Sequence, residues 1–299
     1  MTLPAGAANR VRIWCLAMRP RTLPAAVAPV LVGTAAAAGN GRLKPLPALS
    51  AMAGALLLQI AVNLANDYFD GCRGIDTNRR LGPVRATQSG LIAPAQVLGA
   101  MWLTLALASL CGLYLASVGG WPVVAIGLAS MAGVLGYSGG PYPLASHGLG
   151  DLCVFLFFGP VAVCGTYYVQ ALTLTGTVVL WAIPPGLLIT AILVVNNLRD
   201  RETDEETGKH TLAVKIGPRW TRLEFAALVL AAYALPPVLL ASGAGTGPIL
   251  LPLLTLPMGI HGIRRLYHER GAALNLRLGA TAMLALWFSV LWSVGIAAS

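Results

Sequence analysis

Three aspartates stand close together in the stretch NLANDYFDGCRGID, which begins at Asn63 and contains Asp67, Asp70 and Asp76. The stretch follows a long apolar run, PALSAMAGALLLQIAV. Only 11 of the 299 residues are acidic, so three of them at the end of one apolar segment require a chemical explanation. Bare carboxylates beside a membrane core repel one another and lose hydration, and a bound divalent cation would reverse that cost.

A second acidic stretch, VVNNLRDRETDEETGKHTLAVKIG, has a similar arrangement. Asn196 precedes Asp200 by four residues, the interval that also separates Asn63 from Asp67. A further aspartate follows in each stretch. Asp70 stands seven residues after Asn63, and Asp204 stands eight residues after Asn196. On a helix these spacings place the amide and both carboxylates on one stripe. The two stretches therefore predict two helices that end in matching acidic stripes, and a weak internal repeat.

Facing acidic stripes would hold two or more Mg²⁺ ions around a diphosphate, because Mg²⁺ takes oxygen ligands and usually bridges carboxylates to substrate phosphates. Arg and Lys side chains nearby would hold the remaining phosphate oxygens. The alternative is a solvated acidic loop end balanced by Arg73, Arg79 and Arg201, which explains one stretch better than it explains a matched pair. The other downstream acids are expected to be ordinary solvated charges: Glu205, Glu206, Glu224 and Glu269.

The composition identifies the elements that must position these residues. The chain is 57% hydrophobic and 10% charged, with a mean hydropathy of +0.73, whereas a soluble domain would carry about 25% charged residues. We therefore expect an all-α integral membrane protein. Nine apolar runs are long enough to span, with proline and glycine tolerated inside several of them: 23–40, 46–66, 96–116, 120–138, 151–171, 178–198, 222–242, 247–264 and 278–297.

Charge predicts how these spans are oriented. With nine spans, every Lys and Arg except Arg42 and Lys44 falls on the side of the N-terminus, and all 11 acidic residues fall there too. The positive-inside rule makes that side cytoplasmic, so we expect a multi-pass protein of the cell inner (plasma) membrane with its active site on the cytoplasmic face. The segment RVRIWCLAM, near the N-terminus, is expected to lie flat at the interface.

The two acidic stretches resemble the paired aspartate-rich motifs of the UbiA-type intramembrane prenyltransferases. Within that superfamily the resemblance is closest to the branch that prenylates 1,4-dihydroxy-2-naphthoate in menaquinone synthesis, through RPRTLPAAVAPVLVGTA, RLGPVRATQSGLI and GYSGGPYPLASHGLGDLCVFLFFGPVAVCGTYYVQ. One departure concerns Asp76, which follows Asp70 by six residues where the compact superfamily motif has four. A second is Arg21 in RPRTLP, where a lysine is often found.

The resemblance implies a fold and a reaction. The fold is a bundle of about nine transmembrane helices around a central cavity open to lipid, with residues 1–299 forming a single transmembrane prenyltransferase domain. Mg²⁺ and basic side chains bind a polyprenyl diphosphate and stabilise the departing diphosphate, and an electron-rich aromatic carbon attacks the allylic cation. In the naphthoate branch the attacked carbon loses its carboxylate as CO₂, which gives demethylmenaquinol. The partners would be these substrates and membrane lipid, without nucleic acid.

The resemblance also implies roles for individual residues. Catalytic roles are implied for Asp67, Asp70, Asp200, Asp204 and Lys209. The same four aspartates would bind metal, with Asp76 and Asn66 as helpers. Lys209 and Arg199 are the expected diphosphate contacts. Arg85 and Arg21 are candidates for holding the acceptor carboxylate, and Arg85 is also a candidate for the diphosphate.

Further substrate contacts are implied for Asn63, Asn196 and Asn197, which would orient a carboxylate or touch the diphosphate, and for Tyr137, whose ring face would line the cation pocket. Each has a structural alternative. The amides could instead join helices, Arg85 could be an interfacial anchor, and Tyr137 could belong to the interfacial belt. Asp151 could be a charge at a helix N-terminus.

Competing functions predict different placements of charge. An ion-coupled transporter would carry its acids near the middle of its spans, whereas these acids stand at helix ends on one face. Within the prenyltransferases, the alternative acceptors are 4-hydroxybenzoate, homogentisate and haem. The sequence therefore favours an enzyme over a transporter, and the naphthoate branch over the other acceptors.

Overall fold

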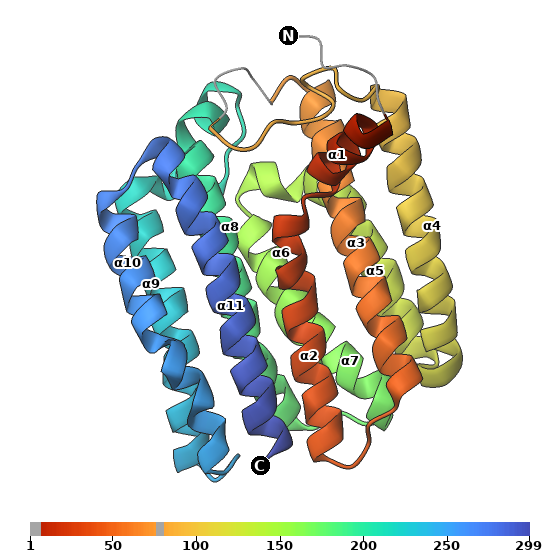
Figure 1. The fold of residues 1–299 in the computed structure, drawn as a ribbon, viewed down its shortest axis with the longest axis vertical. Helices are drawn as coiled ribbons and strands as arrows, with labels where there is room; N and C mark the ends of the chain where they lie inside the picture. Colours follow the sequence, from red (N-terminus) through yellow and green to blue (C-terminus); the bar gives the residue numbers. More distant parts are fainter. Residues whose placement is uncertain (1–6, 76–80) are drawn as a thin grey trace.

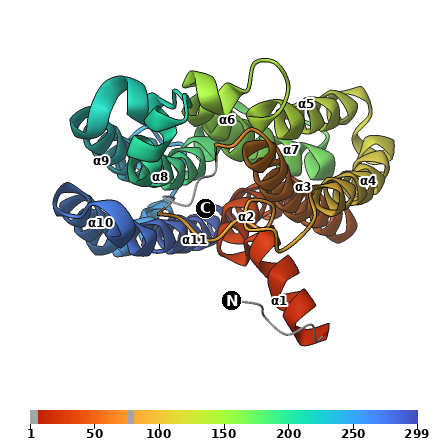
Figure 2. The ribbon, with the colours of Figure 1, turned by 90° about the horizontal axis from the view of Figure 1, so that it is seen from above.

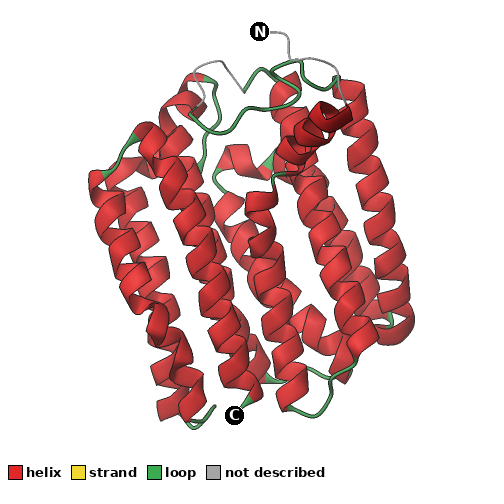
Figure 3. Ribbon diagram, viewed as in Figure 1, coloured by secondary structure: helices red, strands yellow, loops and turns green. Residues whose placement is uncertain are grey.

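The computed structural model describes residues 7–75 and 81–299, and within these ranges it contains helices and loops without a strand (Figures 1 and 3). The elements are α1 (Ala7–Met18), η1 (Pro20–Thr22), α2 (Leu23–Gly39), α3 (Pro45–Cys72), α4 (Pro94–Gly119), α5 (Trp121–Ser138), η2 (Leu144–His147), α6 (Gly150–Leu156), η3 (Phe157–Val161), α7 (Ala162–Ala171), α8 (Gly176–Glu206), α9 (Leu212–Ala241), η4 (Gly247–Thr255), α10 (Leu256–His268), η5 (Gly271–Ala273) and α11 (Leu274–Ala297). The expected all-α membrane fold is confirmed.

Eight helical segments among the described residues are long and apolar enough to cross a membrane. The eighth predicted span, 247–264, is instead a 3₁₀ segment, η4, followed by α10. Three prolines in this region, Pro248, Pro252 and Pro257, remove backbone donors and break the helix into two parts. The two parts together still run the height of the bundle beside α11, and α1 and the C-terminus lie at opposite ends (Figure 1).

One crossing is built from three consecutive elements, α6, η3 and α7, which together cover Gly150–Ala171. The central element is a π-helical turn that contains Pro160. At this turn Gly159 packs against Gly186 of α8, and a Cβ atom on Gly186 would lie 2.9 Å from the Cα atom of Gly159. Small residues let helices in a membrane approach this closely, so η3 is held tightly against the helix that carries the second acidic stretch.

Buried apolar residues form two clusters. One cluster joins α2, α7, α8, α9 and α11 and contains Phe225, Phe288 and Trp292. The other joins α1, α3, α4 and α5 and contains Met101 and Leu105. Helices α3 and α8, which carry the two acidic stretches, therefore belong to different packed halves of the bundle. Seen from above, α1 extends away from the ring of long helices (Figure 2).

Candidate active site

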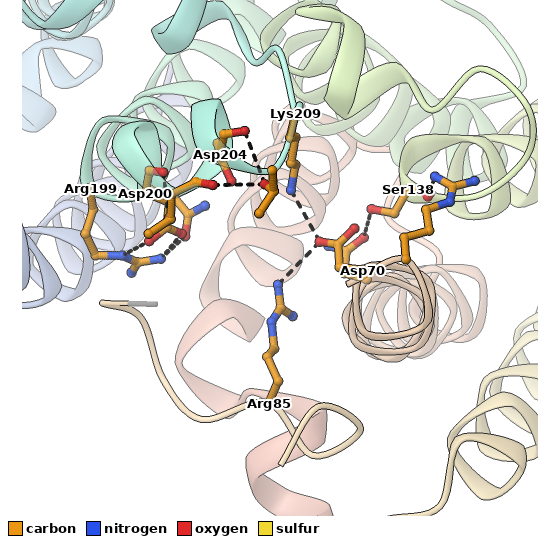
Figure 4. Close-up of polar contacts among 12 residues, drawn as sticks. Asp70, Arg85, Ser138, Arg199, Asp200, Asp204 and Lys209 are labelled. Atoms are coloured by element: carbon orange, nitrogen blue, oxygen red, sulfur yellow. Dashed lines mark hydrogen bonds and ion pairs between the residues drawn. The ribbon is translucent and has the colours of Figure 1, made fainter. Parts of the chain in front are cut away.

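The ends of α3 and α8 bring the two acidic stretches to one end of the bundle. Figure 4 shows Asp70 facing Asp200 and Asp204, with Lys209 and Arg85 reaching toward Asp70 from two sides. The four paired aspartates are buried, with exposed fractions of 1% for Asp67, 2% for Asp70, 4% for Asp200 and 7% for Asp204. Such burial excludes the solvated loop end as the explanation of these carboxylates.

Asp70 is held by cations from two different loops. Lys209 Nζ donates a hydrogen bond to Asp70 Oδ2 at 3.3 Å, and Arg85 Nη2 lies 3.7 Å from the same oxygen. Lys209 follows α8, whereas Arg85 follows α3. A buried carboxylate needs such partners because burial removes its hydration. Asp70 is therefore the point at which the two acidic stretches are joined.

Asp67 is engaged differently from Asp70. Its two carboxylate oxygens accept hydrogen bonds from the backbone N–H groups of Ala86 and Thr87, at 3.1 and 3.2 Å. Asp67 thereby fixes the loop that carries Arg85. A Cβ atom on Gly71 would lie 3.0 Å from Thr87 Cγ2, so the loop packs closely on α3. The role of Asp67 as a metal ligand stays a prediction, since a carboxylate oxygen has a second lone pair available.

The second stretch forms its own buried network around Arg199. The guanidinium donates to both oxygens of Asp200, at 2.8 and 2.5 Å. It also donates to Asn196 Oδ1 at 2.9 Å and to Asn275 Oδ1 at 3.0 Å. The planar fork of arginine suits this bidentate contact. Arg199 therefore orients Asp200 and links α8 to α11.

Two asparagines of the first stretch make interhelical contacts. Asn63 Nδ2 donates to the carbonyl oxygen of Met18 at 2.8 Å and to Thr22 Oγ1 at 2.9 Å. Asn66 Oδ1 accepts a 2.6 Å hydrogen bond from Ser138 Oγ, at the end of α5. These bonds are of the helix-joining kind that the amides of membrane helices form. Direct contact of either amide with substrate stays a prediction.

The remaining predicted residues lie in several places. Arg21 is exposed in η1, at the start of α2. Tyr137 is partly buried near the end of α5, and its hydroxyl packs against Gly150. Asn197 is buried on α8. Asp76 lies outside the described residues. The structure therefore gathers the paired aspartates, Arg85, Arg199 and Lys209, and leaves Arg21 at the surface.

Two of the basic residues considered as solvated partners have other contacts. Arg73 donates to the carbonyl oxygens of Ser138 and Gly140, at 2.8 and 2.5 Å, and so ties α3 to the loop after α5. Arg201 pairs with Glu202 and Glu205 on the outer face of α8. Arg73 therefore shapes the rim of the site, whereas Arg201 belongs to an ordinary surface pair.

The donor set fits Mg²⁺, although the carboxylates do not form a closed cage. Over residues 7–75 and 81–299, no three His, Cys, Asp or Glu side chains converge as a metal-binding group. Asp70 and Asp200 are paired with cations, and Asp67 accepts hydrogen bonds from two backbone amides. Mg²⁺ commonly needs only one or two carboxylates and completes its shell with water and substrate phosphate. The residues therefore suit a metal that arrives together with a diphosphate.

Three contributors to this site were not predicted: Thr22, Ser138 and Asn275. Thr22 bonds to Asn63, Ser138 bonds to Asn66, and Asn275 bonds to Arg199. Asn275 also donates to the carbonyl oxygen of Leu81 at 2.8 Å, which links α11 to the loop after α3. No local sequence signal marks these residues, because each is defined by a partner far away in the chain.

Comparison with known proteins gives a consistent result. Residues 26–288 match the model of the UbiA prenyltransferase family. The chain is 43% identical over 227 residues to 1,4-dihydroxy-2-naphthoate octaprenyltransferase of Mycobacterium tuberculosis, covering 76% of this chain and 77% of that protein. It is also 38% identical over 285 residues to the protein of the same name from Mycobacterium leprae, and the match covers 95% of this chain and 94% of that protein.

A solved structure shares the fold at low sequence identity. It is that of a UbiA homolog from Archaeoglobus fulgidus bound to GPP and Mg²⁺. It superposes with a TM-score of 0.64 at 14% identity, covering 94% of this chain and all of that one. At this identity the likeness establishes the arrangement of helices alone.

Proposed function

This chain belongs to the UbiA prenyltransferase family, and we propose that it transfers a polyprenyl group from polyprenyl diphosphate to 1,4-dihydroxy-2-naphthoate. The reaction releases CO₂ and diphosphate and gives demethylmenaquinol, a step of menaquinone biosynthesis. The observation that carries the proposal is the pair of buried acidic stretches joined through Asp70 and Lys209. The names of the bacterial relatives support the naphthoate as acceptor.

Lys209 is placed to bind the diphosphate. It contacts Asp70, so it can turn toward phosphate oxygens when the negative charge of the substrate enters. A positive charge that is already positioned and little hydrated stabilises developing negative charge more strongly than the same charge in water. Bound Mg²⁺ would add Lewis-acid stabilisation of the leaving diphosphate, with Asp67, Asp70, Asp200 and Asp204 as its ligands.

Asp67 and Arg199 act through the residues that they hold. Asp67 fixes the backbone at Ala86 and Thr87 and so sets the position of Arg85. Arg199 fixes the orientation of Asp200 through two hydrogen bonds. Such positioning lowers the cost of organising charged groups when the allylic bond breaks. In this account Arg85 is the cation that holds the acceptor carboxylate, since the exposed Arg21 lies at the surface.

The protein is a multi-pass membrane protein, and we place it in the cell inner membrane with the site on the cytoplasmic face. The positive-inside rule supports that side, because the loops at the acidic end carry nearly all the basic residues. Residues 1–299 would act as one prenyltransferase domain. A water-soluble aromatic acid would reach the site from the cytoplasm, while the prenyl chain would lie among the helices.

The proposal is tested with purified protein, Mg²⁺, a polyprenyl diphosphate and a mixture of three acceptors. The acceptors are 1,4-dihydroxy-2-naphthoate, 4-hydroxybenzoate and homogentisate, and the prenylated products are identified by mass spectrometry. We expect only the naphthoate to be consumed. A prenylated product from another acceptor alone would retain the prenyltransferase but refute the naphthoate assignment.

A further inference from the structure

Asp151 is a buried carboxylate outside the two acidic stretches. It is 7% exposed, at the start of α6. Its Oδ2 atom is buried and accepts no hydrogen bond from the residues that the structure describes. Buried polar atoms of native proteins almost always have a partner, and a buried carboxylate without one is costly. The uncompensated oxygen therefore indicates a group that meets its partner when a ligand binds.

The surroundings of Asp151 connect it to the active site. The hydroxyl of Tyr137 lies 3.2 Å from the position of a Cβ atom on Gly150, the residue before Asp151. Asp151, Asp70 and Asp204 all lie within electrostatic range of that hydroxyl. Helix α6 stands between α5 and α8, as the view from above shows (Figure 2). Tyr137 therefore lies near Asp151 and also near the paired aspartates.

A role at the helix N-terminus does not account for this arrangement. A carboxylate in the first turn of a helix interacts favourably with the positive end of the helix dipole. That benefit is available to an exposed side chain as well, so it gives no reason for burying Asp151. The missing partner of Oδ2 needs a different explanation.

The chemistry of the acceptor supplies a suitable partner, and this step rests on the proposed function. In 1,4-dihydroxy-2-naphthoate the 1-hydroxyl is next to the carboxylate and forms an internal hydrogen bond with it. The 4-hydroxyl, across the ring, remains free to donate. A carboxylate is an acceptor-only group at neutral pH and suits a hydroxyl donor. Repulsion between two carboxylates also favours placing Asp151 at the far edge of the ring from the substrate carboxylate.

We propose that Asp151 accepts a hydrogen bond from the 4-hydroxyl of the naphthoate acceptor and selects dihydroxy acids over monohydroxy acids. The cation that holds the acceptor carboxylate, Arg85, comes from the loop after α3, whereas Asp151 comes from α6. The ring is then held at its two edges by residues of opposite charge. Because the 4-hydroxyl is meta to the attacked carbon, its contribution is mainly to binding and orientation.

The test compares 1,4-dihydroxy-2-naphthoate with 1-hydroxy-2-naphthoate, which lacks only the 4-hydroxyl. The unmodified enzyme should prefer the dihydroxy acid by at least ~10-fold in kcat/KM, because the analogue leaves a buried acceptor unpaired. In Asp151→Leu and Asp151→Asn this preference should shrink, most strongly in Asp151→Leu. The KM for polyprenyl diphosphate should stay within about twofold, since no contact to the diphosphate has been removed.

A matched control is Glu224→Gln, which neutralises a half-buried carboxylate on α9 within electrostatic range of Asp151. This variant should keep the preference of the unmodified enzyme. Thermal unfolding in detergent checks the folding of all variants, and Asp151→Asn preserves the shape of the side chain if Asp151→Leu is unstable. A preference that is unchanged in a folded Asp151 variant would overturn the inference. An unmodified enzyme that consumes neither naphthoate would refute the proposed function instead.

Discussion

Lys209 Nζ donates a hydrogen bond to Asp70 Oδ2 at 3.3 Å and so joins the loop after α8 to the end of α3. The two residues are 139 positions apart in the chain and belong to the two separate acidic stretches. In the absence of substrate, this contact compensates the charge of a buried carboxylate. We propose that the same lysine becomes a phosphate ligand when a diphosphate enters. The contact therefore connects the fold to the reaction.

Replacement of Lys209 should chiefly impair use of the prenyl donor. We expect Lys209→Met to lower kcat/KM for polyprenyl diphosphate by about 100-fold, since one preorganised charge contact to the leaving group is lost. Steady-state kinetics over a range of diphosphate concentrations measures the effect. Lys44→Met is the control, because Lys44 is exposed and lies on the side predicted to face away from the cytoplasm. Equal losses in the two variants would contradict the assignment.

Asp67 and Asp200 should differ in their effect on the loop that follows α3. Asp67→Asn replaces a carboxylate that accepts two backbone hydrogen bonds, each worth about 1.5–3 kcal/mol when the acceptor is charged. Amide hydrogen exchange at Ala86 and Thr87 should therefore accelerate by about 10-fold or more. Asp200→Asn is the matched control, because it removes a charge from the site without touching this loop. Unchanged exchange in Asp67→Asn would refute the positioning role.

Metal and diphosphate should bind together. Because the carboxylates are already paired with cations and amides, Mg²⁺ alone should raise the thermal unfolding temperature little. Mg²⁺ with an unreactive prenyl diphosphate analogue should raise it by several degrees, as mass action predicts for tight binding to the folded state. Thermal shift assays in detergent measure both. A shift by the analogue that is equally large in EDTA would exclude the metal from diphosphate binding.

The orientation in the membrane can be tested with single cysteines. After the native cysteines are replaced by serine, Glu205→Cys should be labelled by a membrane-impermeant maleimide only from the cytoplasmic side, and Ser299→Cys only from the other side. Glu205 and Ser299 are both exposed. Glu205 lies at the end of α8, which meets the start of α11 through Arg199 and Asn275, whereas Ser299 follows the opposite end of α11. An odd number of crossings requires this result. Labelling of both positions from one side would refute the nine-span topology.

Much of the architecture follows from local properties of the chain. The long apolar runs correspond closely to α2, α3, α4, α5, α8, α9 and α11, because a helix is almost the only way to satisfy backbone groups in lipid. The span count and the distribution of charge correctly predicted that the paired carboxylates would share one end of the bundle. The region around Pro252 is the exception. Hydropathy alone predicts one continuous span over 247–264, but the prolines there divide it into η4 and α10.

The detailed contacts could not be predicted in the same way. That Asp67 holds Ala86 and Thr87 depends on a loop folding back onto α3, for which the sequence carries no periodic signal. Asn275 meets Arg199 only because α11 packs beside α8. The unpaired oxygen of Asp151 is likewise a property of the packed structure. Contacts between distant segments depend on tertiary packing. Hydrophobic periodicity and helix propensity describe only local stretches of the chain, so they do not predict such contacts.

Prenyl transfer to the naphthoate should release its carboxylate as CO₂. The most direct measurement supplies purified protein with Mg²⁺, polyprenyl diphosphate and 1,4-dihydroxy-2-naphthoate that carries radioactive carbon in the carboxylate. We expect one labelled CO₂ for each molecule of prenylated product, and none without the prenyl donor. Prenylated 4-hydroxybenzoate or homogentisate formed from a mixture, with the naphthoate recovered unreacted and its label intact, would contradict this expectation.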